Sequence, residues 1–360
     1  MDFSFTSEQE MLRDTVSKFL AARYDLDKSR TAAKTGKGWQ PDVWRGFADE
    51  LGILGATFPE SVGGLDGGPT ELMIILEALG NALVIEPFVE TVVLAGGLLK
   101  RAGAENLLSE IVAGDAVIAV AATEWEDVTT TARQDGDEWV LDGEKIAVVA
   151  APIATHLLVS ARTGDRIGLF VLDTKTRAGL TVKPMRTIDD RTAADLTFDG
   201  LRLPADALLV EDAWASLEQA RDEGAAAIVS EAVGCMRKVL ADTVEYTKQR
   251  SQFGVPISSF QALQHRMVDM YMEVEQAAAA QYLATLKLDA EPAVRARAVS
   301  AAKATIARAA RFVGQNAVQL HGAMGMTEEL AIGHYFKRLT AIEYEFGSRE
   351  WHLDRYAALT

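Results

Sequence analysis

The stretch RSQFGVPISSFQALQHRMVDM, residues 250–270, decides the fold of the C-terminal part of the chain. Its first ten residues contain Gly254 and Pro256 and predict a loop. The run 260–288 then has apolar side chains three and four residues apart, which indicates a long helix. One stripe of this helix contains Phe260, Leu263, Met267, Met270, Tyr271 and Val274.

More helices are expected on both sides of this stretch. A helix is predicted at about 292–318, and QLHGAMGMTEE (319–329) separates it from the last one. Long helices of this kind usually pack into a four-helix bundle, which often also supplies an oligomer interface. We therefore expect a helical domain at 213–360.

The middle of the chain has a different texture. Short β-type runs follow one another without a helical pattern between them: AVIAVAAT, EWVLDGEKIAVV, THLLVSAR, IGLFVLDT, LTVKPM and ADLTFDGLRL. Turns are expected at Asp135-Gly136, Asp142-Gly143 and Asp199-Gly200. Close spacing of short strands indicates a small antiparallel barrel or sandwich, which we place at 116–212.

Residues 1–115 are mostly helical in pattern. Thr6 or Ser7 precedes a run of acidic residues and then apolar residues at helical spacing, as at a capped helix start. The segment ELMIILEALGNAL (71–83) predicts a second helix, which ends before Pro87. The glycine-rich loop PESVGGLDGG (59–68) interrupts this helical domain.

Composition excludes several classes of function. The formal net charge of −16 argues against nucleic-acid and anionic-membrane partners, which require a broad basic face. No apolar stretch approaches the roughly 18 residues that span a bilayer, and the N-terminus has no signal-peptide pattern. The single cysteine, Cys235, excludes an internal disulfide and a CxxC metal signature. We expect a cytoplasmic protein.

Three sequence motifs resemble motifs of the acyl-CoA dehydrogenase family. RSQFG followed by FQALQH and a DM pair resembles the family's R-x-x-F-G…F-Q…D-M pattern, and QLHGAMGMTEE resembles its Q-x-x-G-G-x-G-(F/Y)-T-x-E loop. FPESVGGLDG resembles its PEEYGG-G turn. The resemblance covers essentially the whole chain and implies an α+β multidomain fold, with a helical domain, a middle antiparallel β-barrel and a four-helix bundle. It also implies FAD-dependent α,β-dehydrogenation of an acyl-CoA thioester.

In this family the RSQFG-type and QLHGAMG-type loops reach across a subunit interface to the adenosine-diphosphate half of FAD. An arginine that opens such a loop can pair with pyrophosphate, and glycines let backbone amides approach a ligand closely. The cofactor-binding residues that the resemblance implies are Arg250, Gln252, Phe253, Gln319, His321, Gly322 and Gly325. A surface role remains the alternative for Arg250, and a local loop role for His321.

The flavin-side motifs of the family are degraded here. The T-E-P-x-x-G-S-D segment reads AATEWEDVTT, which keeps only Thr123 and Glu124, and the W-I-T-N strand reads KIAVVAAP. Ala147 therefore stands at the Trp position and Val149 at the Thr position. Since a valine cannot donate to a flavin carbonyl, this departure argues against isoalloxazine binding by this chain.

The family's catalytic base is also out of register. Counting without gaps from Gln319, the glutamate of the family's Y-E-G motif falls on Phe346, because Gly347 aligns with the glycine. Glu345 is displaced by one position, which rotates a side chain by about 100° on a helix.

Some relatives carry the base on the preceding helix instead. Counting back from Arg250 puts that position at Gly224, beside Glu223, while Glu231 lies two turns further along the same face. Glu345, Glu231 and Glu223 are the candidate bases, and for each of them a solvated or ion-paired helix residue is the favoured alternative.

This pattern of kept and lost motifs predicts the partner subunit of a heteromeric, α2β2 acyl-CoA dehydrogenase. Its helical domain would complete the FAD site of a sister chain that owns the flavin cradle and the base. The ending FGSREWHLDRYA resembles that of enzymes acting on CoA thioesters of steroid or bile-acid side chains. The alternatives are a homotetramer that uses a displaced glutamate and a non-catalytic scaffold. Electron-transferring flavoprotein is the electron acceptor that the family implies.

Overall fold

The structure of the chain is a computed structural model, and it describes residues 4–35, 38–124, 127–175 and 178–359. The chain forms two compact units, each made of segments that are distant in sequence. The helical unit contains Met1–Leu26, Gly68–Val84 and Ala225–Thr360, and the sheet unit contains Asp27–Gly67 and Ile85–Gly224. The three-domain division expected from the sequence stays a prediction, because these units combine the segments differently.

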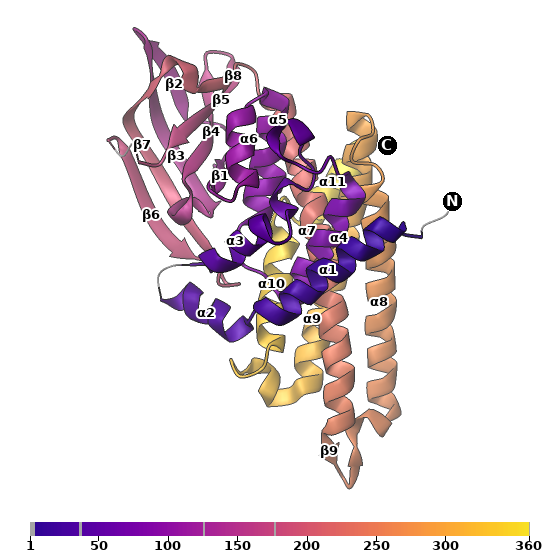
Figure 1. The fold of residues 1–360 in the computed structure, drawn as a ribbon. Helices are drawn as coiled ribbons and strands as arrows, with labels where there is room; N and C mark the ends of the chain where they lie inside the picture. Colours follow the sequence, from indigo (N-terminus) through magenta and orange to yellow (C-terminus); the bar gives the residue numbers. More distant parts are fainter. Residues whose placement is uncertain (1–3, 36–37, 125–126, 176–177, 360) are drawn as a thin grey trace. The chain divides into compact units, whose positions relative to one another are not determined.

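The helical unit is built around a bundle of long helices (Figure 1). Its elements are α1 (Ser7–Arg23), α4 (Pro69–Ala82), α8 (Gln261–Thr285), α9 (Pro292–His321), α10 (Ile332–Tyr344), α11 (Arg349–Ala358) and most of α7 (Trp214–Gln249). Helix α9 packs against α8, α10 and α11. No helix among the described residues is both long and apolar enough to cross a membrane.

The N-terminal helix begins as its sequence predicts. Thr6 is the N-cap of α1, and it forms a capping box with Gln9, in which each side chain binds the other residue's backbone N–H. Helix α4 begins with Pro69 and ends where Leu83 adopts a left-handed conformation with φ of 55°. Both predicted helices are therefore present, and the second ends before Pro87.

The predicted apolar stripe of α8 is buried only in part. Met270 and Val274 have exposed fractions of 0 % and 2 %, whereas Phe260 and Tyr271 remain 38 % and 54 % exposed. The bundle buries the face that also carries Ala277. The sequence period identified the helix but not the face that α9 covers.

Helices α4 and α7 cross at two glycines. A Cβ atom on Gly80 would lie 2.0 Å from the carbonyl oxygen of Glu231, and one on Gly234 would lie 2.0 Å from that of Glu77. The thiol of Cys235 donates to the Gly80 carbonyl at 3.1 Å. No side chain fits between the two backbones at this crossing. The crossing therefore fixes the position of Glu231 along α4.

The sheet unit contains several short helices besides its sheet. These are α2 (Leu26–Lys34), α3 (Pro41–Asp49), the π-helix η3 (Val89–Ala95), α5 (Gly96–Ala102) and α6 (Glu105–Val112), with 3-10 turns η1 (Ile53–Gly55), η2 (Glu60–Val62), η4 (Ala151–Ile153) and η5 (Ala205–Ala207). Residues 214–224 of α7, about three turns of the helix, also belong to this unit.

The sheet has eight strands, paired in the order β6-β7-β3-β2-β4-β5-β8, with β1 on β4. Their bounds are β1 (Ile118–Ala121), β2 (Thr131–Asp135), β3 (Glu138–Val149), β4 (His156–Thr163), β5 (Arg166–Asp173), β6 (Leu180–Arg186), β7 (Thr192–Pro204) and β8 (Leu208–Val210). All six predicted strands are present. Strands β2 and β8 were missed, because TARQD has no apolar run and LLV is very short. The pairings of β4 with β1 and with β2 are parallel, and the others are antiparallel.

Two of the three predicted turns are wrong. Asp135-Gly136 does join β2 to β3, but Asp142-Gly143 lies inside β3 and Asp199-Gly200 lies inside β7. At this level the register between the two strands shifts, and the Gly200 amide donates to Asp142 Oδ1 at 2.7 Å. These dipeptides therefore form an irregularity within a strand pair, where glycine again supplies a positive φ.

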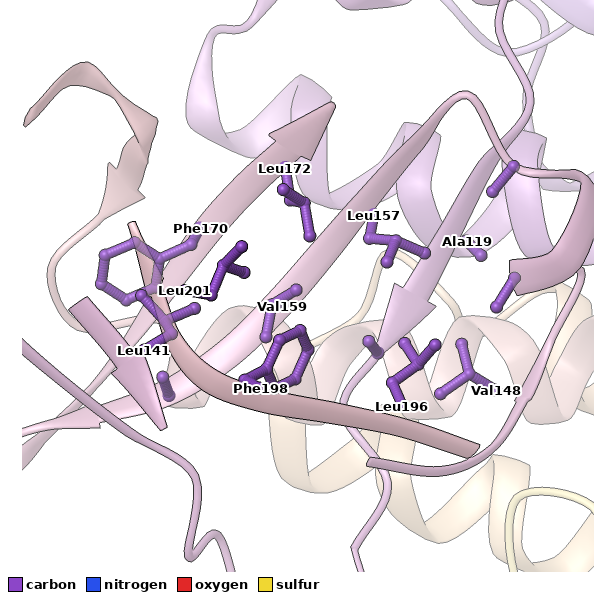
Figure 2. Packing of buried hydrophobic residues seen from close by; sticks show 14 of the residues in the cluster. Ala119, Leu141, Val148, Leu157, Val159, Phe170, Leu172, Leu196, Phe198 and Leu201 are labelled. Atoms are coloured by element: carbon purple, nitrogen blue, oxygen red, sulfur yellow. The ribbon is translucent and has the colours of Figure 1, made fainter. Parts of the chain in front are cut away.

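One face of the sheet carries its hydrophobic core (Figure 2). Leu157 and Val159 of β4, Phe170 of β5, and Leu196 and Phe198 of β7 have exposed fractions of 2 % or less. They alternate along their strands, as expected for a sheet with one face turned inward. This packing gives β3 a rigid support, and β3 carries the segment that corresponds to the family's flavin-binding strand.

Candidate functional site

The RSQFG segment forms a small hairpin between α7 and α8. Strand β9 (Ser251–Gln252) pairs with β10 (Val255–Pro256), and Phe253 and Gly254 at the tip have φ of 54° and 81°. A phenylalanine is uncommon in this left-handed conformation. Phe253 is 93 % exposed, and its ring makes an edge contact with that of Phe260, with centroids 6.2 Å apart. The hairpin therefore presents an aromatic ring away from its own bundle, beside the exposed Arg250.

The QLHGAMG segment turns sharply at the end of α9. Gly322 caps the helix with φ of 58° and ψ of −141°, a backbone region used almost only by glycine, and the 3-10 turn η7 (Gly322–Met326) follows. A Cβ atom on Gly325 would lie 2.7 Å from the Val318 carbonyl oxygen. Both glycines are therefore required by the backbone path, and Gln319 stays exposed beside them.

His321 faces the interior of the helical unit. Its ring stacks on Tyr246 with centroids 4.2 Å apart, and Nδ1 lies 2.8 Å from the Ala317 carbonyl oxygen. Burial lowers the pKa of His321, against the opposing effects of the Ala317 carbonyl and Asp242. A neutral, inward-facing imidazole shapes the loop and leaves Gln319 and Arg250 as the outward polar side chains.

The donors on this surface fit an anionic, aromatic ligand. Arg250, Gln252 and Gln319 carry N–H groups on exposed side chains, and Phe253 offers a face for stacking. Guanidinium and amide donors beside an exposed ring are suited to a pyrophosphate joined to a nucleoside. These residues fit the adenosine-diphosphate half of FAD.

Two positions of the segment that resembles the family's W-I-T-N strand lack such side-chain donors. Ala147 is exposed on β3 with φ of 48°, and its amide already donates to Asp195 Oδ1 at 3.0 Å. Val149 is half-buried and has no polar side-chain atom. Residues 125 and 126 of the AATEWEDVTT segment lie outside the described residues. The side chains at positions 147 and 149 do not fit the polar edge of an isoalloxazine ring, because neither offers a hydrogen bond.

Glu124, which survives from the family motif, is engaged within the sheet unit. It accepts hydrogen bonds from Lys145 Nζ and from the amide and hydroxyl of Thr129, and Lys145 also donates to Ser160 at 3.0 Å. Burial raises the pKa of Glu124, but the bonds from Lys145 and Thr129 outweigh it and lower the pKa to about 2. Burial lowers the pKa of Lys145, and Glu124 opposes this effect. The group acts as a structural ion pair that ties Glu124 and Thr129 to Lys145 of β3.

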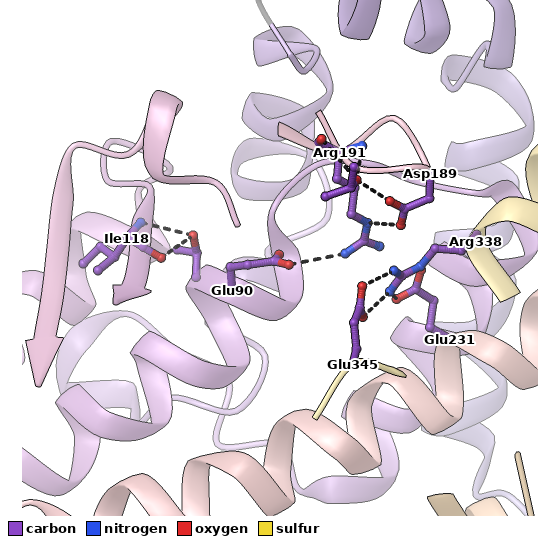
Figure 3. Close-up of polar contacts among 9 residues, drawn as sticks. Glu90, Ile118, Asp189, Arg191, Glu231, Arg338 and Glu345 are labelled. Atoms are coloured by element: carbon purple, nitrogen blue, oxygen red, sulfur yellow. Dashed lines mark hydrogen bonds and ion pairs between the residues drawn. The ribbon is translucent and has the colours of Figure 1, made fainter. Parts of the chain in front are cut away.

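Two of the three candidate bases meet at one arginine (Figure 3). Arg338 of α10 donates from Nε and Nη2 to the two carboxylate oxygens of Glu231, at 2.7 Å and 2.9 Å. It also donates from Nη1 and Nη2 to Glu345, at 2.6 Å and 3.1 Å. Arg338 and Glu231 are 2 % and 3 % exposed. Both oxygens of each carboxylate therefore accept a hydrogen bond from Arg338.

The third candidate, Glu223, lies in the sheet unit. Its Oε1 accepts from Arg101 Nη1 at 2.7 Å and from Gln219 at 2.9 Å. Its other oxygen faces Gly97, where a Cβ atom would lie 2.6 Å away. All three candidates are thus ion-paired, and whether any of them acts as a base stays a prediction.

Side chains bind the backbone carbonyl groups of the turn that aligns with the family's base position. Phe346 has φ of 56°, and His352 Nε2 lies 3.0 Å from its carbonyl oxygen. Lys303 Nζ donates to the carbonyl oxygens of Glu343 and Gly347, at 3.1 Å and 3.0 Å. Burial lowers the pKa of Lys303 to about 8, against the attraction of Glu345 and Glu343. The position that aligns with the family's catalytic glutamate is therefore occupied by Phe346, whose aromatic side chain has no proton to exchange.

A second buried charge group lies in the sheet unit. Glu90, on the π-helix η3, accepts from Arg191 at 3.3 Å, and Arg191 Nε lies 3.7 Å from Asp189 (Figure 3). Thr91 bonds both the amide and the carbonyl of Ile118 at 3.1 Å. These contacts join η3 to β1 and to the turn before β7.

Arg338 and Lys303 were not predicted as site residues from the sequence. Neither belongs to a motif, and each stands among helical residues that predict only an amphipathic helix. Glu343 and Glu345, at the end of the helix that contains Arg338, gave a partial signal, because buried carboxylates need cations. Which cation would meet them depends on three helices that are distant in sequence.

Comparison with known proteins identifies the family. The family models described as acyl-CoA dehydrogenase N-terminal, middle and C-terminal domains match residues 6–114, 108–201 and 213–359. Acyl-CoA dehydrogenase FadE12 of Mycobacterium tuberculosis is 32 % identical, over 92 % of this chain and 90 % of that protein.

Solved structures give the same result for the fold. The ChsE4-ChsE5 complex from Mycobacterium tuberculosis contains a chain with a TM-score of 0.91 and 27 % identity, covering 99 % of this chain and 98 % of that one. The Tcur3481-Tcur3483 steroid ACAD gives a TM-score of 0.89 at 28 % identity, covering 98 % and 97 %. The fold class predicted from the sequence is confirmed.

Proposed function

Because the chain belongs to the acyl-CoA dehydrogenase family, whose cofactor is FAD, we propose that it is one subunit of a heteromeric enzyme and contacts the adenosine-diphosphate half of that FAD. The enzyme class is an oxidoreductase acting on acyl-CoA. The sister subunit would supply the flavin cradle and the catalytic carboxylate.

One contrast carries this proposal. The exposed side chains of Arg250, Gln252, Phe253 and Gln319 fit a nucleoside pyrophosphate, whereas Ala147 and Val149 offer nothing to a flavin ring. A self-sufficient enzyme needs both halves of the site. A chain that keeps only the adenosine side is useful when another chain brings the rest.

The residues of this chain would act by binding and orienting. Arg250 would pair with the pyrophosphate, and Phe253 would pack on the adenine or ribityl part. Gly322 and Gly325 would let backbone amides approach the ligand. The chemistry that FAD supplies when bound is acceptance of the hydride from the β-carbon, while a carboxylate of the sister chain takes the α-proton.

Two relatives support the heteromeric assembly and a bulky substrate. The ChsE4-ChsE5 structure is a complex of two differently named chains, and the Tcur3481-Tcur3483 protein is described as a steroid ACAD. We extend both features to this chain, with a CoA thioester of a steroid or bile-acid side chain as substrate. The electron acceptor would be electron-transferring flavoprotein. The location would be the cytoplasm, because the single cysteine is buried and forms no disulfide that would need an oxidising compartment.

The two alternative functions are a homotetrameric enzyme and a non-catalytic scaffold. A homotetramer with a displaced glutamate would need Glu345 to leave Arg338, which binds both of its oxygens. A non-catalytic scaffold has no physical need for an exposed Phe253 in a left-handed conformation. Both alternatives therefore explain less of the structure than the partner-subunit proposal does.

Co-expression tests the proposal. The chain is produced alone and together with an intact-cradle acyl-CoA dehydrogenase chain of its source organism, and flavin absorbance and acyl-CoA-dependent dye reduction are recorded. The proposal expects a colourless chain alone and a yellow, active complex. A yellow and active homomer would establish the self-sufficient homotetramer. The absence of flavin from every preparation would establish the non-catalytic scaffold.

A further inference from the structure

Helices α9 and α11 of the helical unit enclose two adjoining hollows. The first has a volume of about 270 Å³ and the second of about 230 Å³, and Arg308 of α9 and Arg349 of α11 line both of them. Pockets for whole drug-sized ligands usually have volumes of about 300–1,000 Å³. Each hollow therefore suits a small ligand, or the end group of a larger one.

The first hollow exists because α9 presents short side chains to α11. Ala301 and Ala304 line it on the side of α9. The two helices are joined close by, where His352 Nδ1 of α11 lies 3.1 Å from the Ser300 hydroxyl of α9. This contact holds α11 in place, and Arg349, the first residue of that helix, with it.

The first hollow is basic. Arg308 donates from Nη1 to Glu273 at 2.8 Å and from Nη2 to Gln276 at 3.0 Å, so two of the five N–H groups of its guanidinium are used. Arg349 is exposed and takes part in none of the salt bridges among the described residues. Among the described residues that line this hollow, none is acidic.

The second hollow is closer to neutral. Glu343 and Glu350 line it together with Arg308, Arg311 and Arg349. Arg311 binds both oxygens of Glu343, with Nε 3.0 Å from Oε2. Carboxylates therefore offset the arginines here, and an anion is favoured in the first hollow.

The arginines are the donors that a ligand in the first hollow would meet. The Thr305 hydroxyl already donates to the Ala301 carbonyl at 2.9 Å, and the Ser300 hydroxyl is engaged by His352. A carboxylate has two oxygens and is filled by one guanidinium, whereas a phosphate group has three or more and can accept from two. Two arginines from different helices thus match a phosphate better than a carboxylate.

We propose that the first hollow between α9 and α11 binds a phosphate group, held by Arg308 and Arg349. In a chain with a formal net charge of −16, this is a local basic site that draws an anion to one place. It is distinct from the adenosine-side loops, because Thr305 lies about 20 Å along α9 from Gln319 at about 1.5 Å per residue. The site goes beyond the proposed function and does not rest on it.

Calorimetric titration of the full chain with inorganic phosphate, at constant ionic strength, tests the site. Wild type should show saturable binding, and Arg349→Leu should weaken it by about tenfold or more. Ala301→Leu keeps every charge and fills the hollow, so it should weaken binding as strongly. The control is Arg297→Leu, an exposed arginine of α9 outside both hollows, which should bind phosphate like wild type.

Titration with ADP identifies the source of the phosphate group. Weaker ADP binding in Arg349→Leu would assign the site to a nucleotide. ADP binding that depends on Arg250 alone, together with the loss of inorganic phosphate binding in Arg349→Leu, would assign it to free phosphate or a simple phosphate ester.

Two results would overturn the proposal. One is the absence of saturable phosphate binding by wild type, and the other is equal phosphate affinity in wild type, Arg349→Leu and Ala301→Leu. These titrations use no flavin and no sister chain, so their failure leaves the partner-subunit proposal to its own flavin measurement.

Discussion

Lys303 of α9 and Gly347 are joined by a hydrogen bond of 3.0 Å from the ammonium group to the carbonyl oxygen. The same Nζ binds the Glu343 carbonyl at 3.1 Å, so one buried side chain links the end of α10 to the turn that precedes α11. A cation at the end of a helix is favoured by the helix dipole, but its burial is costly.

This burial predicts a rise of stability at alkaline pH. The pKa of Lys303 falls from 10.5 in the unfolded chain to about 8 in the folded protein. Between these values the unfolded state binds more protons, so the free energy of unfolding rises with pH, by about 3 kcal/mol from this group. Below pH 8 both states are protonated and the cost is constant.

Lys303→Met should remove that slope. Denaturant unfolding between about pH 8 and pH 10 measures it, and Lys287→Met, at an exposed position, is the matched control. Equal slopes in Lys303→Met and wild type would contradict the buried-cation account.

The low pKa of Glu124 predicts that stability also rises with pH in the acid range. Its pKa of about 2 lies below the ordinary value of 4.5, so its contribution to stability is complete above pH 4.5 and is lost as pH falls toward 2. Glu124→Gln should lack this part of the acid dependence. At neutral pH it should also cost about 3–5 kcal/mol, because Lys145 is left buried without its counter-charge.

Acid unfolding followed by circular dichroism would show the effect of Glu124. Glu144→Gln, at an exposed position on β3 next to Lys145, is the control. If Glu124→Gln and Glu144→Gln unfolded alike, the ion pair with Lys145 would not be the structural link that we describe.

Arg338→Leu should be the most damaging single change in the helical unit. It leaves two carboxylates without their cation at a site where the arginine is 2 % exposed, and breaking such buried pairs costs about 3–5 kcal/mol. Arg311→Leu, whose side chain is 54 % exposed, should cost clearly less. A smaller loss for Arg338→Leu than for Arg311→Leu in thermal unfolding would contradict the structural role of the Arg338 ion pairs.

Phe253 should matter to flavin binding and not to folding. Its ring is 93 % exposed, so Phe253→Ala should leave the melting temperature of the isolated chain unchanged. In the complex with the sister chain, the variant should weaken FAD retention by about tenfold, as expected when one stacking ring is lost. Met272→Ala, at 53 % exposure on α8, is the control. Equal FAD retention in both variants would remove Phe253 from the site.

Individual helices and strands were predictable where the local sequence pattern was strong. The run 260–288 identified α8, and EWVLDGEKIAVV identified β3 at its observed bounds. The Asp-Gly pairs at 142 and 199 misled because a positive-φ glycine serves a strand irregularity as well as a turn. Strand β2 has no apolar period, since its pattern is mostly exposed.

The candidate site was predictable only in part. The loops at 250 and 319 follow recognisable motifs, and their glycines and exposed donors lie as those motifs suggest. The cation that meets Glu231 and Glu345 could not be predicted, because ion pairing between α7 and α10 depends on packing over more than a hundred residues of sequence separation. His321 is a similar case, since its stacking on Tyr246 is a tertiary contact.

The amount of FAD bound per chain tests the central claim most directly. The chain is purified alone and as a complex with its sister subunit, and flavin absorbance is compared with protein concentration. The account predicts no flavin on the chain alone and half as many flavins as chains in the complex. FAD retained by the chain alone, together with acyl-CoA dehydrogenation, would contradict it.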